Sequence, residues 1–123
     1  MNGSRIVLMI EDDSDIRELL AGRVRRLGLE VVTATTGAAG LKLAREHQPD
    51  LVVVDIGLPD IDGWNVIQQL AEDERTRDIP IVVASIADPE PGKSLRIHAH
   101  LVKPIKKGAL EDAILLAIRK DES

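Results

Sequence analysis

Five polar residues of this chain could act together, because each of them follows a short apolar run. They are Glu11, Asp12, Asp55, Ser85 and Lys103. An all-oxygen site of one to three carboxylates suits a hard divalent cation, and magnesium keeps several waters when it is bound in this way. A carboxylate beside such a cation is also a competent phosphoryl acceptor, since the charge on the transferring group is neutralised. The residue types therefore predict magnesium binding and phosphoryl acceptance.

The charges of this set must be balanced if the side chains lie close together. Two carboxylates about 4 Å apart repel by roughly 4 kcal/mol at an effective dielectric near 20. Lys103 supplies one positive charge, and it can pair with Asp55 or with an incoming phosphate. The cation, the Lys103 ammonium and the Ser85 hydroxyl could each take one phosphoryl oxygen. A hydroxyl that moves to meet those oxygens would act as a switch.

Alternating apolar runs and amphipathic segments position these residues. Because strand and helix alternate, the pattern favours an α/β fold with a parallel sheet and helices on both faces. The expected fold is a flavodoxin-like, doubly wound, five-stranded sheet of order 2-1-3-4-5, in which ligands bind at the carboxyl ends of the strands. The expected strands are 6–10, 30–34, 51–54, 79–84 and 101–102, and the expected helices are 14–27, 38–47, 64–73 and 108–120.

Three acidic residues near the expected site have simpler interpretations. Ser14 can cap the first helix, and Asp13 is a solvated or capping residue. Asp60 and Asp62 are expected to be turn residues rather than ligands. Trp64 is expected to pack at a helix start.

Length and composition exclude several functions. The chain has 123 residues, which predicts one domain over 1–123, and 44% of them are apolar. The formal net charge of −5 argues against nucleic-acid binding. Cysteine is absent, which excludes disulfides. No apolar run approaches the roughly 18 residues that span a bilayer, so a soluble, cytoplasmic protein without membrane contact is expected.

Five segments of the chain, taken in order, resemble response-regulator receiver domains of two-component signalling. The similarity covers essentially the full length, and each segment alone would be a weak match. The matching segments are 7–13, 51–55, 58–63, 81–85 and 101–105, with sequences Val-Leu-Met-Ile-Glu-Asp-Asp, Leu-Val-Val-Val-Asp, Leu-Pro-Asp-Ile-Asp-Gly, Ile-Val-Val-Ala-Ser and Leu-Val-Lys-Pro-Ile.

The resemblance implies a role for each site residue. Asp55 matches the phosphoacceptor, which takes a phosphoryl group with Mg²⁺ as cofactor. Asp12 matches a direct metal ligand, Glu11 acts on the metal mainly through water, and Gly57 offers its backbone carbonyl as a ligand. The donor in this family is a phosphohistidine of a sensor histidine kinase or of a histidine phosphotransfer protein.

The resemblance also implies how the site signals. Ser85 matches the switch hydroxyl and Lys103 the family's lysine, so that phosphorylation would switch a protein-interaction surface. Such a protein is a phosphoacceptor rather than an enzyme, although it assists its own phosphoryl transfer and hydrolysis. The output partner and the kinase are not readable from the sequence, and a homodimer stays open. The chain could be a single-domain regulator or part of a longer one.

Three features depart from the family pattern. His100 stands where receivers carry Tyr or Phe as a rotamer switch, and it is either a switch or simply exposed. The interval between Ser85 and Lys103 is shorter than usual, so the family's fourth helix should be short or irregular, with a short helix over 93–98 possible. Ile86 follows the switch hydroxyl where a small residue is usual, and it could narrow access to Asp55.

The same fold also serves proteins with other functions. The main alternative is a receiver-like binding module that works without phosphorylation, which the departures above motivate. A flavin carrier needs a phosphate cradle after its first strand, and Glu11 and Asp12 would instead repel a phosphate there. A haloacid-dehalogenase-type phosphatase needs an Asp pair two residues apart after the first strand, and Glu11 with Asp13 does not supply it.

Overall fold

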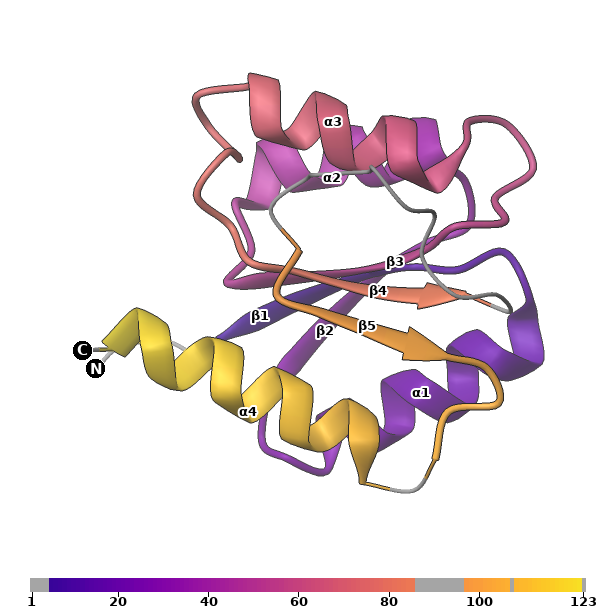
Figure 1. Ribbon diagram of the computed structural model, residues 1–123, viewed down its shortest axis with the longest axis vertical. Helices are drawn as coiled ribbons and strands as arrows, with labels where there is room; N and C mark the ends of the chain where they lie inside the picture. The colour runs from indigo at the N-terminus through magenta and orange to yellow at the C-terminus, as the bar shows by residue number, and fades with distance from the viewer. Residues whose placement is uncertain (1–4, 86–96, 107, 123) are drawn as a thin grey trace.

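The computed structural model describes residues 5–85, 97–106 and 108–122 of the chain. Helices lie on both sides of a central sheet, as Figure 1 shows. In chain order the elements are β1 (Ile6–Ile10), α1 (Ser14–Arg25), β2 (Glu30–Ala34), α2 (Gly37–His47), β3 (Leu51–Asp55), α3 (Gly63–Glu72), β4 (Ile81–Ser85), β5 (Ala99–Val102) and α4 (Ala109–Glu122).

The sheet confirms the predicted topology. Five strands lie in the order β2-β1-β3-β4-β5, and every neighbouring pair is parallel. Every residue of β3 and β4 is buried, as expected for central strands covered on both faces. All carboxyl ends of a parallel sheet meet at one edge, so the residues that follow these strands become neighbours there.

Alternate strand residues feed two separate cores. Val7, Met9 and Val53 face a cluster formed with α1 and α4, whereas Leu8 and Val52 face a cluster formed with α2 and α3. Both clusters are built from aliphatic residues, with Trp64 as the single aromatic ring among them. The helices on both faces thus follow from the two-residue period of the strands.

The helix termini are capped by acidic and hydroxyl side chains. Asp13 caps α1, where its carboxylate accepts from the Ile16 amide, so the expected cap at Ser14 is wrong by one residue. Thr36 caps α2 and Asp62 caps α3. The capping interpretation of Asp13 and the turn interpretation of Asp62 are consistent with these contacts.

Three strands differ from their predicted bounds, and β3 does so only by including Asp55. β4 begins at Ile81 rather than at residue 79, because the Ile79 amide bonds to the Thr76 carbonyl and so belongs to the preceding turn. β5 begins at Ala99, two residues earlier than predicted, through pairing with β4. The predictions for the fourth helix of the family and for Ile86 fall largely on 86–96, outside the described residues.

Candidate functional site

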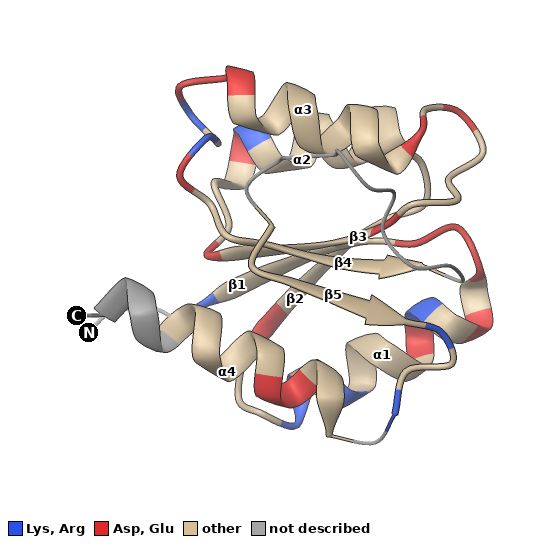
Figure 2. Ribbon diagram, viewed as in Figure 1, with Lys and Arg blue, Asp and Glu red and all other residues tan. Residues whose placement is uncertain are grey.

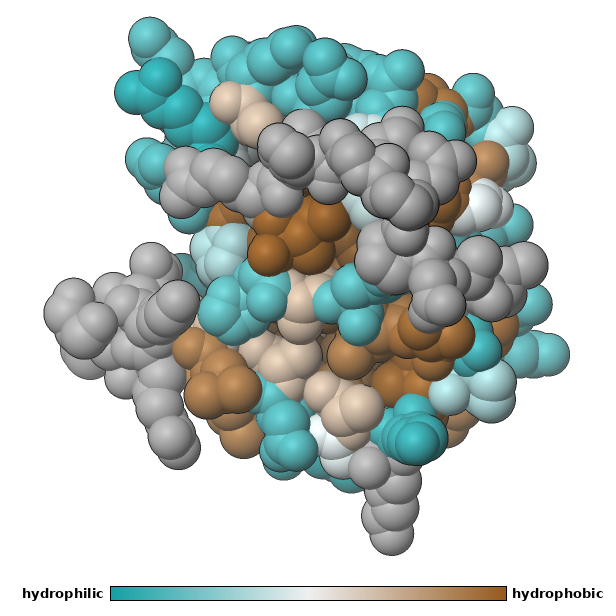
Figure 3. Space-filling view, viewed as in Figure 1, coloured by the Kyte–Doolittle hydropathy of each residue, from teal (hydrophilic) through white to brown (hydrophobic). Residues whose placement is uncertain are grey.

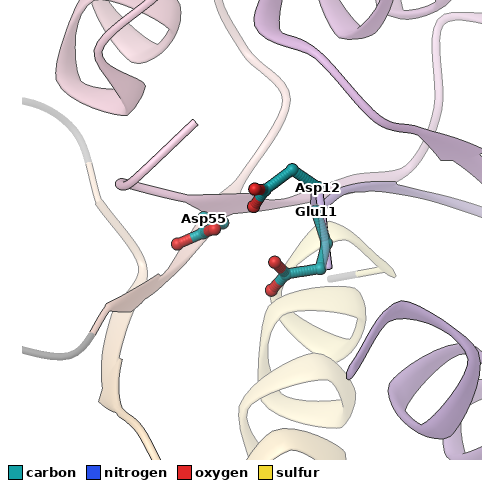
Figure 4. Close-up of side chains that lie close together, drawn as sticks. All are labelled: Glu11, Asp12 and Asp55. Carbon is teal, nitrogen blue, oxygen red and sulfur yellow. The ribbon is translucent and has the colours of Figure 1, made fainter. Parts of the chain in front are cut away.

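Three carboxylates converge at the carboxyl ends of β1 and β3. Glu11 and Asp12 come directly after β1, and Asp55 is the last residue of β3. Each side chain offers an oxygen, and these three oxygens lie within 4.8 Å of one another. Figure 4 shows the carboxylates of Glu11 and Asp12 directed to the side where Asp55 lies. Strand register explains the convergence, since Ile10 pairs with Val54 one residue before the acidic residues.

The three carboxylates differ in their exposure. Glu11 is 2% exposed and Asp55 is 7% exposed, whereas Asp12 is exposed. The cluster is therefore open to solvent on the side of Asp12 and closed on the side of Glu11. Figure 2 shows that the loop after β1 is acidic. The whole edge is thus poised to attract a cation.

Lys103 contacts two of the carboxylates. Its Nζ lies 2.8 Å from Glu11 Oε1 and 3.4 Å from Asp55 Oδ1, with the lysine side chain 13% exposed. The backbone delivers this side chain, because the Lys103 amide donates to the Ser85 carbonyl at 2.6 Å as β5 leaves β4. The expected pairing with Asp55 is thus present, and a shorter contact to Glu11 accompanies it.

The pKa values of this pair follow from burial and charge. Burial raises the pKa of Glu11, the hydrogen bond from Lys103 opposes that change, and the charge of Asp55 adds to it, so that the pKa lies above its usual value. Burial acts to lower the pKa of Lys103, but the hydrogen bond to Glu11 and the charge of Asp55 outweigh it and raise that pKa. Lys103 therefore carries its positive charge into the site at neutral pH.

The loop after Asp55 folds back on the phosphoacceptor candidate. The Gly57 amide donates to Asp55 Oδ1 at 3.1 Å, and the Gly63 amide donates to the Ile56 carbonyl at 3.0 Å. A Cβ atom at Gly63 would lie 2.5 Å from the Ile56 Cα, so this close approach requires glycine. The contact of Gly57 with Asp55 uses its amide, and its carbonyl stays a predicted metal ligand.

Ser85 and His100 form a second part of the site. Ser85 Oγ lies 2.9 Å from His100 Nε2. Ser85 is the last residue of β4, and His100 lies in β5, which pairs with β4. The imidazole is half-buried and meets Trp64 edge-on, with ring centroids 6.3 Å apart. Its Nδ1 is buried and has no hydrogen-bond partner among the residues that the structure describes. His100 is therefore joined to the predicted switch hydroxyl rather than simply exposed.

The contacts of two residues near the site were not predicted from the sequence. Arg17 donates from Nη1 to the Glu11 carbonyl at 3.1 Å, which fixes the backbone between β1 and α1. Asp60 accepts from the Gly37 and Ala38 amides at the start of α2. Arg17 follows the Asp13 cap by one helical turn, and that spacing could have indicated its contact. Nothing local in the sequence pairs Asp60 with α2.

The donor set fits a magnesium ion. Carboxylate oxygens alone make up the cluster, one of the carboxylates is open to water, and magnesium prefers oxygen ligands while keeping several waters. Among the described residues no thiolate or imidazole joins the three carboxylates in this cluster, which argues against a softer metal. Asp12 and Asp55 are placed to hold such an ion, with Glu11 partly engaged by Lys103.

The fold and the site together define a class of protein. Residues 7–115 match the family model of the response regulator receiver domain. The chain therefore belongs to the response regulator receiver domains, which are signalling proteins of two-component systems rather than conventional enzymes.

Similar proteins agree with this assignment. A transcriptional regulatory protein of Streptomyces coelicolor is 35% identical over 120 residues, which cover 94% of this chain and 52% of that protein. The chain spans about half the length of these curated relatives. The similarity therefore concerns only the matched part of those relatives.

Solved structures show the same fold. A sensor protein from Polaromonas has a TM-score of 0.86 and 30% identity, and the match covers 94% of this chain and 97% of that one. The receiver domain of a sensor histidine kinase from Pseudomonas aeruginosa, with a magnesium ion coordinated in its active site cleft, has a TM-score of 0.85 at 21% identity over 95% of this chain and 99% of that one. The latter likeness concerns the fold.

Proposed function

We propose that Asp55 accepts a phosphoryl group from a phosphohistidine of a sensor histidine kinase or of a histidine phosphotransfer protein. The observation that carries this proposal is the convergence of Glu11, Asp12 and Asp55 within 4.8 Å, with the Lys103 ammonium 3.4 Å from Asp55 Oδ1. A phosphoacceptor needs a carboxylate that is reachable and positive charge that can meet the phosphoryl oxygens. The exposed Asp12 side of the cluster and the nearby Lys103 ammonium support the proposal on these two points.

Mg²⁺ is the proposed cofactor. Asp12, Asp55 and the backbone carbonyl of Gly57 would hold it, and Glu11 would act through water. When bound, the ion supplies positive charge that neutralises a phosphoryl oxygen. The similar receiver domain from Pseudomonas aeruginosa contains magnesium in its cleft, which supports this assignment.

The proposed phosphoryl transfer is a substitution at phosphorus. An oxygen of the Asp55 carboxylate attacks the phosphorus, the bond from phosphorus to the donor imidazole nitrogen breaks, and an acyl phosphate forms on Asp55. The bonding electron pair leaves with the imidazole, which takes up a proton. Lys103 and Ser85 stabilise the phosphoryl oxygens by charge and by an O–H donor.

The proposed signal passes through Ser85 and His100. Phosphorylation adds negative charge and strong acceptor oxygens at Asp55, and the Ser85 hydroxyl would donate to one of them. That movement would break the 2.9 Å contact between Ser85 and His100. His100 would then be free to change its position beside Trp64, which is the proposed switch.

A second candidate function is a receiver-like binding module that works without phosphorylation. It is favoured by the engagement of Ser85 with His100 and of Lys103 with Glu11, because both groups are already partnered. This alternative predicts no Mg²⁺ affinity and an unchanged structure in the Asp55→Asn variant. A dissociation constant for Mg²⁺ in the millimolar range or tighter would count against it.

The output partner is proposed only by class. In the family the face near the last strand and last helix is the usual output surface, and Figure 3 shows apolar side chains over β5 and α4. Val102 is 45% exposed and Leu116 is 58% exposed on these elements. We propose that this face binds a protein partner, which could be a second copy of the chain.

Two further proposals concern nucleic-acid binding and the location of the protein in the cell. The expectation that these residues bind no nucleic acid stays a prediction, since the Streptomyces relative is named a transcriptional regulatory protein and is about twice as long. Among the described residues no helix is both long and apolar enough to cross a membrane. A cytoplasmic location is proposed because the partner kinases of such domains act there.

Acetyl phosphate with Mg²⁺ provides the test of the proposed function. We expect intact-protein mass spectrometry to show the addition of one phosphoryl group to the wild-type chain and none to Asp55→Asn. Omitting Mg²⁺ should abolish the addition. An unmodified wild-type chain, with no response to beryllofluoride either, would overturn the proposal in favour of the phosphate-independent module.

A further inference from the structure

Asp60 joins two parts of the structure that are distant in sequence. Its Oδ1 accepts from the Gly37 amide at 2.8 Å and its Oδ2 accepts from the Ala38 amide at 3.0 Å. Both carboxylate oxygens are thus used on the first turn of α2, where amides have no partner within the helix. A residue of the loop that follows β3 in the chain therefore completes the start of this helix.

The contact between Asp60 and α2 is close and charged. A Cβ atom added at Gly37 would lie 2.9 Å from Val66 Cγ2 and 3.1 Å from Ile61 Cβ, so the loop, α2 and α3 meet without spare room. The hydrogen bonds from Ala38 and Gly37 lower the pKa of Asp60, which keeps the carboxylate ionised at neutral pH. A negative charge is favourable at a helix N-terminus.

The other end of the same loop is fixed at the phosphoacceptor candidate. The Gly57 amide donates to Asp55 Oδ1, and the Gly63 amide closes the loop by donating to the Ile56 carbonyl. The loop from Ile56 to Asp62 is therefore held at its base by Gly63 and Gly57. Asp60 is the side chain through which its outer part is attached to a neighbouring helix.

We propose that Asp60 is a positioning residue of the site: its attachment to α2 holds the loop so that Gly57 stays against Asp55 and presents its backbone to the metal. Asp60 itself touches neither the metal nor a phosphoryl group. The inference rests on the proposed magnesium-dependent function, which gives the position of Gly57 its importance. Loss of the attachment should let the loop move and weaken Mg²⁺ binding.

Asp60→Ala is the variant that tests this proposal, and two matched variants control for other effects. Thr36→Ala removes the side chain that accepts from the Ala39 amide at 3.1 Å, so it uncaps the same helix without releasing the loop. Asp62→Asn removes a charge from the same loop and keeps an oxygen for the Trp64 amide. The three variants separate attachment, helix capping and charge.

Mg²⁺ titration and amide hydrogen exchange are the two measurements. The titration is followed by the fluorescence of Trp64, the single tryptophan of the chain, and checked by calorimetry. We expect Asp60→Ala to weaken Mg²⁺ binding about tenfold, the lower range for loss of a supporting partner of a metal site. The Gly57 amide should also exchange faster. Neither property should change more than about twofold in Thr36→Ala or Asp62→Asn, since neither variant releases the loop.

Several results would overturn the proposal. Equal weakening in Thr36→Ala would assign the effect to helix capping, and equal weakening in Asp62→Asn would assign it to charge. Unchanged affinity and exchange in Asp60→Ala would show that the attachment does not hold the loop. A wild-type chain that binds no Mg²⁺ would contradict the proposed function instead, and the exchange rate of the Gly57 amide would still decide the role of Asp60.

Discussion

Lys103 is shared between two carboxylates, and this sharing bears on how the site could respond to a phosphoryl group. Its Nζ is closer to Glu11 than to Asp55, at 2.8 Å against 3.4 Å. Glu11 is buried, and removing a partner from a buried charge is costly. A phosphoryl group on Asp55 would therefore have to compete with Glu11 for the ammonium, and bound Mg²⁺ would ease that competition by balancing the carboxylates.

The chemistry of individual residues and the pairing of Lys103 with Asp55 were predictable from the sequence, but the contact of Lys103 with Glu11 was not. Asp55 and Lys103 were identified because each follows an apolar strand, and parallel strands end at one edge. The contact of Lys103 with Glu11 depends on side-chain directions that a strand pattern does not contain. Likewise, the imidazole of His100 could not be placed beside Ser85 until the register of β5 on β4 was known.

His100→Phe tests the role of the imidazole. Phenylalanine has a similar shape, keeps the edge contact with Trp64 and removes a buried Nδ1 that lacks a partner within the described part of the chain. We expect the free energy of unfolding to change by less than about 1 kcal/mol, because the lost hydrogen bond and the lost unsatisfied atom offset each other. Loss of the contact between His100 and Ser85 should tighten beryllofluoride binding, measured by fluorescence titration.

Ser85→Ala is the matched variant for this experiment. It breaks the same contact from the other side and also removes the hydroxyl that would meet a phosphoryl oxygen. We expect weaker beryllofluoride binding in Ser85→Ala and tighter binding in His100→Phe. Changes in the same direction in both variants would show that His100 does not compete with the phosphoryl site for Ser85.

At the scale of elements, the helices and strands were predictable because the apolar runs have clear periods. The ends were less predictable, since local hydrogen bonds decide them, as at Asp13 and Ile79. The approach of α2 to the sheet was not predictable either. It depends on Gly40, where a Cβ atom would lie 2.3 Å from Ile10 Cδ1, and a lone glycine within a helical pattern does not reveal its neighbour.

The pairing of α1 with α4 provides a pH-dependent test at this scale. Arg23 on α1 contacts Glu111 on α4 through two hydrogen bonds of 2.9 Å, and the side chains are 13% and 23% exposed. The hydrogen bond from Arg23 lowers the pKa of Glu111. The Glu111 carboxylate therefore binds a proton more readily in the unfolded chain than in the folded one. The stabilisation by the pair of Arg23 and Glu111 is complete above the unfolded pKa of about 4.3 and is lost as the pH falls through the pKa of Glu111 in the folded chain.

We accordingly expect Glu111→Gln to lower the free energy of unfolding by about 1 kcal/mol at pH 7. The difference from wild type should shrink as the pH is lowered below about 4, where both chains lack the charge. Urea denaturation at several pH values measures this. Asp112→Asn, in the same first turn of α4, is the control. A difference that grows toward acid pH would contradict the assignment to Arg23.

At the scale of the whole molecule, the site concentrates negative charge on a protein that is already acidic. The formal net charge is −5, and three carboxylates meet within 4.8 Å at one edge of the sheet. Clustered like charges destabilise the folded state more than the unfolded one, because the unfolded chain separates them. The three carboxylates therefore repel one another in the folded chain, and a bound cation would reduce this repulsion.

Mg²⁺ should accordingly stabilise the whole fold by mass action. A ligand that binds only the folded state adds about 2.7 kcal/mol to the free energy of unfolding at a concentration 100 times its dissociation constant. We expect the melting temperature to rise with Mg²⁺ concentration in the wild-type chain, measured by calorimetry at constant ionic strength. Sodium chloride at the same ionic strength is the control for simple screening.

Asp12→Asn separates the relief of charge repulsion from the direct binding of Mg²⁺. Asp12 is the exposed carboxylate of the cluster, so its neutralisation should raise the melting temperature without Mg²⁺ by reducing the repulsion. The same change removes a proposed direct ligand, so the additional rise with Mg²⁺ should largely disappear. An Asp12→Asn chain that gains as much from Mg²⁺ as the wild type would show that Asp12 is not a ligand of the ion.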